Sequence, residues 1–165
     1  MENFKIDDSI LASRGQRLLN YLIDIIIIYT IIIVLVFVTV FLEELLGGAA
    51  IYEWTQSMSN LEGYLLFYLV MFTYYIIFEA YFSRTIAKYI TKTLVVTEDG
   101  LPVDLKTIVQ RTFCRIIPFD PFSFLGNPSR GWHDSISNTY VVDKEAFERS
   151  RDAFYSLEEI GKTQD

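Results

Sequence analysis

Residues 17–42 read RLLNYLIDIIIIYTIIIVLVFVTVFL. From Ile25 to Leu42 it contains eighteen residues without a charge. An apolar run of about that length indicates a membrane-spanning helix. We therefore predict a first span over residues 18–42, about 37 Å long as a helix. A cleaved signal peptide is the alternative, but its apolar region would be far too long.

A second apolar stretch, GYLLFYLVMFTYYIIFEAYFS, covers residues 63–83 and holds one charge, Glu79. Its length also suits a membrane span. The segment between the two spans is short, so we expect them to form a helical hairpin.

The distribution of lysine and arginine predicts the orientation of this hairpin. Residues 43–62 contain four glutamates and no lysine or arginine, whereas basic residues precede the first span and follow the second. The positive-inside rule then places both termini in the cytoplasm and the acidic loop outside. We expect a multi-pass protein of the plasma membrane, with the lipid bilayer as its surroundings.

Composition excludes several classes of function. The net charge of −7 leaves no basic excess for binding nucleic acid. One cysteine, Cys114, and one histidine, His133, are too few for a zinc site or an internal disulfide. No glycine-rich phosphate-binding loop is present. We predict no metal, no cofactor and no enzymatic activity.

Each predicted span carries one carboxylate near its cytoplasmic end, Asp24 in the first and Glu79 in the second. Helical spacing gives each span a polar face, and these faces comprise Arg17, Asn20 and Asp24 on one helix and Tyr75, Glu79 and Ser83 on the other. If the two faces meet, they form a polar pocket at the cytoplasmic mouth of the hairpin.

Two interpretations of these carboxylates remain open. In the first, Asp24 and Glu79 orient the helices by pairing with Arg17, Arg84 or backbone groups. In the second, they form a cation or proton site, because two close carboxylates can exchange a proton for a cation.

The chain after the second span predicts a short strand and an amphipathic helix. Thr93–Thr97 is rich in β-branched residues and precedes an Asp-Gly turn. We expect residues 139–142 to pair with residues 94–96. Asp104 starts a basic amphipathic helix over residues 105–117, which should lie in the inner headgroup region.

The apolar segment that follows this helix is interrupted by Pro118, Asp120 and Pro121. It is too short to span alone and suits a re-entrant or interfacial segment. A tilted third span over residues 105–125 is the alternative. We therefore predict an α-helical membrane protein: a two-span hairpin, a cytoplasmic amphipathic or re-entrant helix, and a small β element. The membrane domain covers residues 1–143, and a charged cytoplasmic tail covers residues 144–165.

Asp134 lies close in sequence to several basic residues. We expect it to pair with at least one of Arg111, Arg115 and Arg130 and to fix its loop on the membrane face. His133 precedes it, but neighbouring residues on a helix point in different directions, so no catalytic dyad is expected.

Four segments carry a family resemblance in their order along the chain: RLLNYLID, TIAKYITKTLVVTEDG, RTFCR and RGWHDSISNTYVV. Over residues 10–143 the sequence resembles the RDD family of small membrane proteins, named for one arginine and two aspartates. The match assigns these roles to Arg17, Asp24 and Asp134. Thr85 and Lys88 match the family's Gly-x-Thr-x-Gly-Lys stretch, in which Ser83 and Ala87 replace the glycines.

Charge, spacing and resemblance together give one set of candidate site residues, for an ion or for structural polar contacts: Arg17, Asp24, Glu79, Thr85, Lys88, Arg111, Arg115, His133 and Asp134. The resemblance implies transport of a monovalent cation or proton, since some members resemble sodium/proton antiporters. Two spans cannot form an alternating-access path alone, so a transporter would have to be a homo-oligomer. The alternative is an accessory or scaffold protein that holds a partner protein at the membrane.

Overall fold

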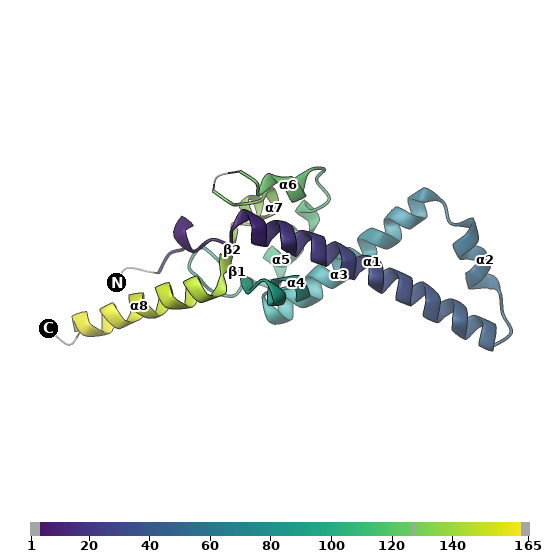
Figure 1. Cartoon of the computed structure of the whole chain (residues 1–165), viewed down its shortest axis with the longest axis horizontal. Helices are drawn as coiled ribbons and strands as arrows, with labels where there is room; N and C mark the ends of the chain where they lie inside the picture. Colours follow the sequence, from purple (N-terminus) through teal and green to yellow (C-terminus); the bar gives the residue numbers. More distant parts are fainter. Residues whose placement is uncertain (1–3, 127, 163–165) are drawn as a thin grey trace.

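Two long apolar helices dominate the computed structural model, which describes residues 4–126 and 128–162. They are α1 (Arg14–Leu45) and α3 (Asn60–Phe82), and the short helix α2 (Ala50–Ser57) connects their far ends (Figure 1). Both are long and apolar enough to cross a membrane. The prediction of two such helices is confirmed, and each begins a few residues earlier than expected.

Side-chain caps explain where both helices begin. Ser13 accepts a hydrogen bond from the backbone N–H of Gln16, and the Gln16 side chain accepts one from the backbone of Ser13. Ser59 and Glu62 form the same reciprocal arrangement before α3. Such capping boxes satisfy backbone donors that the first helical turn leaves without partners.

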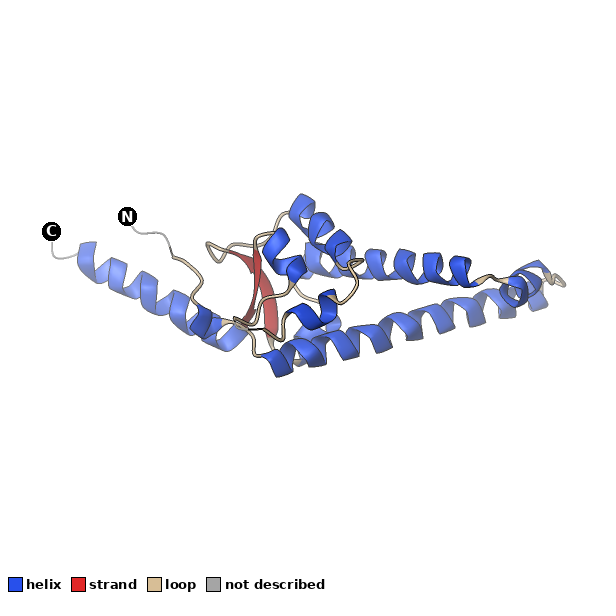
Figure 2. Ribbon diagram, turned by 90° about the horizontal axis from the view of Figure 1, so that it is seen from above, coloured by secondary structure: helices blue, strands red, loops and turns tan. Residues whose placement is uncertain are grey.

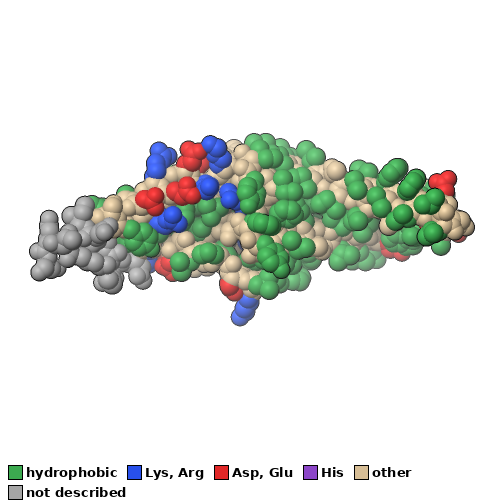
Figure 3. Space-filling view, turned by 90° about the horizontal axis from the view of Figure 1, so that it is seen from below, with side chains coloured by type: hydrophobic (Ala, Val, Ile, Leu, Met, Phe, Trp, Pro, Cys, Tyr) green, Lys and Arg blue, Asp and Glu red, His purple; other side chains and the backbone are tan. Residues whose placement is uncertain are grey.

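Helix α1 buries polar residues and exposes apolar ones, the reverse of a helix in a soluble protein. Its buried residues are Arg17, Asn20, Asp24 and Ile28. Large apolar side chains such as Ile33 and Phe37 are exposed by about two thirds. Figure 3 shows this apolar surface covering the half of the molecule formed by the two long helices. A hydrocarbon environment suits such a surface, because lipid tails solvate apolar side chains.

A small sheet lies beside the ends of the two long helices that are remote from α2 (Figure 2). Strands β1 (Thr93–Thr97) and β2 (Thr139–Asp143) pair antiparallel, with Thr93 opposite Asp143 and Thr97 opposite Thr139. The predicted strand pairing is confirmed. The sheet is apolar on both faces because a separate hydrophobic cluster covers each face. One cluster includes Phe4, Ile10 and Phe147, and the other includes Ala12, Val103 and Ile108.

The remaining elements surround this sheet. They are the 3₁₀ turn η1 (Asp8–Ile10), α4 (Ile86–Ile90), α5 (Leu105–Cys114), α6 (Asp120–Ser123), α7 (Trp132–Ile136) and α8 (Lys144–Lys162). Helix α8 follows β2 without a loop and places Phe147 in the sheet's hydrophobic cluster. The expected tail is therefore helical along its described length, and its first turns pack against the rest of the fold.

The alternative of a third span after β1 is wrong. Helix α5 has ten residues and α6 four, so residues 105–125 do not form a third span. Within α5, Arg111 is buried together with Ile108 and Thr112, while Leu105 and Phe113 are exposed by more than half. The helix also ends earlier than predicted, since turns replace it after Cys114 and before Pro118.

Candidate functional site

Buried charged side chains gather where α1, α3, α4, α5 and α7 meet. The structure brings together all nine sequence-predicted site residues: Arg17, Asp24, Glu79, Thr85, Lys88, Arg111, Arg115, His133 and Asp134. All are buried except Arg115, whose side chain is 13% exposed. Unpaired charges are costly at such burial, so their partners determine what the site can do.

Glu79 is surrounded by cations. Its Oε1 accepts from Lys88 Nζ at 3.1 Å and from Arg115 Nη2 at 3.4 Å, and its Oε2 accepts from Arg111 Nε at 3.2 Å. This carboxylate is therefore neutralised within the protein. Glu79 and Asp24 therefore do not form a pair of free carboxylates.

Asp134 forms the second ionic centre. Arg17 Nη2 donates to one of its oxygens and Arg111 Nη1 to the other, and the backbone N–H of Gly131 adds a third donor at 2.9 Å. The prediction that Asp134 pairs with an arginine is confirmed for Arg111. Burial raises the pKa of Asp134, but Arg111 and Arg17 outweigh it and hold that pKa well below its usual range.

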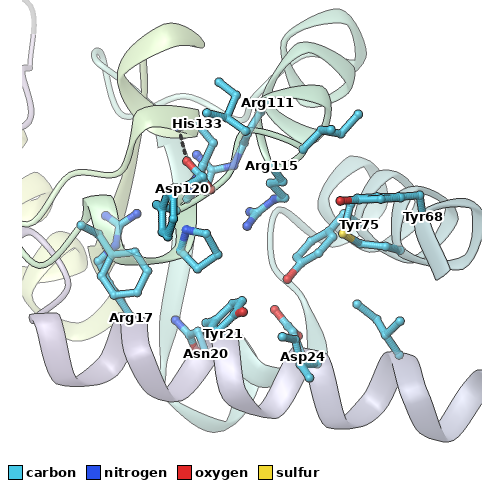
Figure 4. A pocket seen from close by; sticks show the side chains of 18 of the residues that line it. Arg17, Asn20, Tyr21, Asp24, Tyr68, Tyr75, Arg111, Arg115, Asp120 and His133 are labelled. Carbon is cyan, nitrogen blue, oxygen red and sulfur yellow. Dashed lines mark hydrogen bonds and ion pairs between the residues drawn. The ribbon is translucent and has the colours of Figure 1, made fainter. Parts of the chain in front are cut away.

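His133 lies between two carboxylates. Its Nδ1 is 2.7 Å from Asp120 Oδ2, and its Nε2 is 3.3 Å from Asp134 Oδ1 (Figure 4 shows the Asp120 contact). The expectation that His133 and Asp134 point apart is wrong, because the five-residue α7 lets the imidazole fold back over its neighbour. Burial lowers the pKa of His133 to about 4, although Asp134 opposes that shift.

Asp24 has a different environment from the other carboxylates. Tyr74 donates its hydroxyl to Oδ1 at 2.6 Å, and Thr85 donates to Oδ2 at 2.9 Å. Among the described residues it forms no salt bridge, so the predicted pairing with Arg17 is wrong. Arg17 instead reaches Asp134, and Arg84 stacks its guanidinium 3.8 Å above the Tyr89 ring.

The turn from α3 into α4 positions Thr85 and Lys88. Ser83 ends α3 in the left-handed conformation, with φ of 56°. This conformation suits the glycine that the resemblance assigns to this position, since glycine adopts positive φ without strain. Ala87 is fully buried, so only a small residue fits at the second glycine position. Burial lowers the pKa of Lys88, against the opposing effects of Glu79 and Asp24.

A half-open cavity of about 260 Å³ lies between the two long helices and the α5–α6 segment. Its polar wall includes Arg17, Asp24, Lys88, Arg111, Arg115 and Asp120. Its apolar wall includes Ile25, Ile28, Phe67, Met71, Ile117 and Phe124. Figure 4 shows the Arg115 side chain reaching into the space between Tyr75 and Asp120, opposite Asp24. The predicted polar pocket at the mouth of the hairpin is present.

Several site contacts were not anticipated from sequence. Asn20 accepts from Thr91 Oγ1 at 2.5 Å and donates to Thr93 Oγ1 at 3.0 Å, which joins α1 to the start of β1. Tyr74 was not predicted as a site residue because the predicted polar face of this helix begins one position later, at Tyr75. The signal was weak: threonine and tyrosine are common on apolar elements, and only the tertiary fold shows which hydroxyls have carboxylate partners.

The donor set does not resemble a metal centre. Within residues 4–126 and 128–162, no group of three or more His, Cys, Asp and Glu side chains is arranged to hold a metal ion. Two of the nearby carboxylates, Glu79 and Asp134, are already occupied by Lys88 and by arginines.

Comparison with known proteins supports the assignment made from the residues. The RDD family model matches residues 11–138, most of the chain. No match was found among curated proteins or among solved structures. The three residues expected to give the family its name, Arg17, Asp24 and Asp134, all lie in the buried polar cluster. The chain therefore belongs to the RDD family and is a membrane protein with two long apolar helices.

Proposed function

We propose that this RDD protein is a proton- or cation-coupled transporter of the plasma membrane that acts as a homo-oligomer. Both termini and the sheet face the cytoplasm, and α5 and α6 lie at the inner headgroup region. Lysine and arginine are absent between Glu43 and Glu62, which supports this orientation. The protein has no catalytic role in this proposal, and the buried charges serve binding.

The observation that carries this proposal is the environment of Asp24. It borders the cavity, is 1% exposed, and is held by two hydroxyl groups rather than by a cation. Asp24 is therefore a buried carboxylate on the cavity wall without an ion-pair partner among the described residues. Ionisable residues inside a membrane protein commonly mark ion or proton pathways.

The proposal needs an oligomer because the described residues of one chain supply two helices long and apolar enough to cross a membrane. Alternating access uses repeats that move against each other around a shared site. The exposed apolar side chains of α1, among them Ile33 and Phe37, offer a surface for a second copy or for lipid.

Flux in proteoliposomes tests the role of Asp24. Purified wild-type and Asp24→Asn proteins are reconstituted at equal density, and internal pH is followed after a gradient of sodium, lithium or potassium is imposed. Asparagine keeps the shape, and the Tyr74 and Thr85 hydroxyls can reorient to suit it. We expect coupled proton flux to fall by at least about tenfold, or about 1.4 kcal/mol in activation free energy.

Two measurements keep this test decisive. The melting temperature of Asp24→Asn should stay near that of wild type, and Asp8→Asn, at an exposed site in η1, should leave flux unchanged. A folded Asp24→Asn protein with wild-type flux would reject the transport role of Asp24. Stable co-purification of one membrane partner, without flux, would favour the scaffold function instead.

A further inference from the structure

We propose that the cavity binds an oxyanion carried by an amphiphile, with the oxyanion at Arg115 and the apolar part against α1 and α3. This inference names a substrate class for the function proposed above and rests on it for the role of Asp24. The binding site itself is argued from the cavity wall.

The cations at the inner end of the cavity differ in how closely they are paired. Four cations, Arg17, Lys88, Arg111 and Arg115, contact only two carboxylates, Glu79 and Asp134. The two other carboxylates bordering the cavity are engaged elsewhere, one by hydroxyl groups and one by His133. Hydroxyl groups and a neutral imidazole cancel no charge, so these two carboxylates offset the cations overall, and an oxyanion would bind through direct contact with the least tightly paired guanidinium.

Arg115 is the most accessible member of this group. It has a long contact of 3.4 Å to Glu79, stacks 4.0 Å above the Tyr75 ring, and keeps 13% of its side chain exposed. Its Nε and the Nη2 of Arg111 are buried without a hydrogen-bond partner among the described residues. Buried polar groups of this kind are normally satisfied, so Arg111 and Arg115 each keep donor capacity that the described residues do not use. Guanidinium groups favour phosphate and carboxylate.

The shape of the lining indicates that the ligand is amphiphilic. The arginines lie at one end, while the walls toward the far ends of the long helices are apolar: Ile25 and Ile28 on α1, Phe67 and Met71 on α3. A small inorganic anion would use only the polar end. Basic pockets beside membrane helices are known to hold anionic lipid headgroups.

Protonation of Asp24 would favour this ligand. A neutral Asp24 removes one negative charge from the cavity wall and leaves the four cations unchanged. Binding of the proton and of the anion would then support each other equally, since coupling between two sites is reciprocal. The proposed function thereby becomes proton-coupled movement of an anionic amphiphile.

Calorimetric titration of the full chain in a neutral detergent tests the site. The probes are dioctanoyl phosphatidic acid, dioctanoyl phosphatidylcholine and inorganic phosphate. We expect the phosphatidic acid to bind at least about tenfold more tightly than the other two, equal to about 1.4 kcal/mol. Equal binding of inorganic phosphate would overturn the amphiphile, and equal binding of phosphatidylcholine would overturn the charge recognition.

Matched variants locate the binding. Arg115→Gln should weaken phosphatidic acid binding at least about tenfold, whereas Arg84→Gln, a charge change outside the cavity, should not. Should Arg115→Gln fail to fold, Ile117→Ser at the exposed rim tests the apolar wall, with Leu101→Ser in the distant β-turn as control. The same affinity in Ile117→Ser and Leu101→Ser would overturn the placement.

Failure of this inference is distinguishable from failure of the proposed function. Asp24→Asn should retain phosphatidic acid binding, because it removes a negative charge, while it loses flux. Arg115-dependent binding without any Asp24-dependent flux would remove the transport function and leave the binding site. Asp24-dependent flux without Arg115-dependent binding would remove the binding site and leave the transport function.

Discussion

Arg17 and Asp134 lie 117 residues apart in the sequence and form a buried ion pair. Arg17 also donates to the Ser129 carbonyl at 2.7 Å, so one guanidinium ties the start of α1 to the loop before α7. Because both side chains are less than 5% exposed, the pair is shielded from solvent. It connects the first long helix to the part of the chain that completes the sheet.

Removing one partner should destabilise the protein strongly. In Arg17→Ala, Asp134 keeps Arg111 but loses its other guanidinium. Breaking a buried pair by removing one partner costs about 3–5 kcal/mol. The measurement is reversible unfolding of purified protein in mixed detergent micelles, followed by circular dichroism.

An exposed pair provides the control for this prediction. Lys5 and Glu98 lie 3.4 Å apart with side chains 68% and 41% exposed. Surface pairs contribute about 0–1 kcal/mol, so Lys5→Ala should unfold nearly as wild type does. Equal losses in Lys5→Ala and Arg17→Ala would contradict a special role for the buried pair.

The sequence predicts the long helices and the sheet well, for physical reasons that act locally. The segment Ile25–Leu42 has no charged residue, and the β-branched run at Thr93–Thr97 favours a strand. The pairing of the strands follows because both are short, apolar and bounded by turns. These features require no knowledge of distant partners.

The partners of the buried charges could not be predicted in the same way. Helical periodicity treats Arg111 as a surface residue, yet it is fully buried because Glu79, Asp134 and Thr139 converge on it. Asp24 was expected near Arg17, but α4 brings Thr85 to it instead. Which charges meet depends on α4 and α7, short elements whose placement has no periodic signal.

The stability of the protein should decrease in mild acid because of His133. Its pKa is lowered from 6.5 to about 4 by burial, so the folded protein holds it neutral where the unfolded chain takes up a proton. The contribution is present above pH 6.5 and is lost as the pH falls from 6.5 to about 4. The loss is on the order of 3 kcal/mol.

Comparison with His133→Gln isolates this effect. Glutamine does not titrate, so the unfolding free energy of the His133→Gln protein should change much less between pH 6.5 and about 4. This holds even if that free energy is lower than the wild-type value at neutral pH. Chemical unfolding at a series of pH values provides the measurement. Parallel curves for the two proteins would show that other groups cause the acid sensitivity.

Ser83→Gly should stabilise the protein. Ser83 adopts φ of 56° at the end of α3, and this conformation costs a non-glycine residue about 1–2 kcal/mol. Glycine removes that strain but gains entropy in the unfolded state, so we expect a net stabilisation of about 0.5–1 kcal/mol. The backbone carbonyl of residue 83, which accepts from Val95 at 2.9 Å, is retained.

The matched control is Ser156→Gly in the exposed part of α8. Ser156 lies within a regular right-handed helix, where glycine costs about 1 kcal/mol relative to good helix formers. The two substitutions should therefore shift the melting temperature in opposite directions. A decrease for Ser83→Gly would mean that its side chain makes a favourable contact that outweighs the backbone strain.

Cysteine labelling in intact cells tests the proposed orientation. In a Cys114→Ala background, Ser57→Cys at the end of α2 should react with a membrane-impermeant maleimide, and Ser156→Cys in α8 should react only after the cells are opened. The loop around residue 57 lacks lysine and arginine, while basic residues lie beyond both spans. Both positions are at exposed residues, so access differs only through the membrane. By sequence alone, residue 160 would serve equally well as the cytoplasmic labelling position, but its side chain lies outside the residues whose side chains the structure describes. Labelling of Ser156→Cys in intact cells would place the C-terminal helix outside and invert or break the hairpin topology.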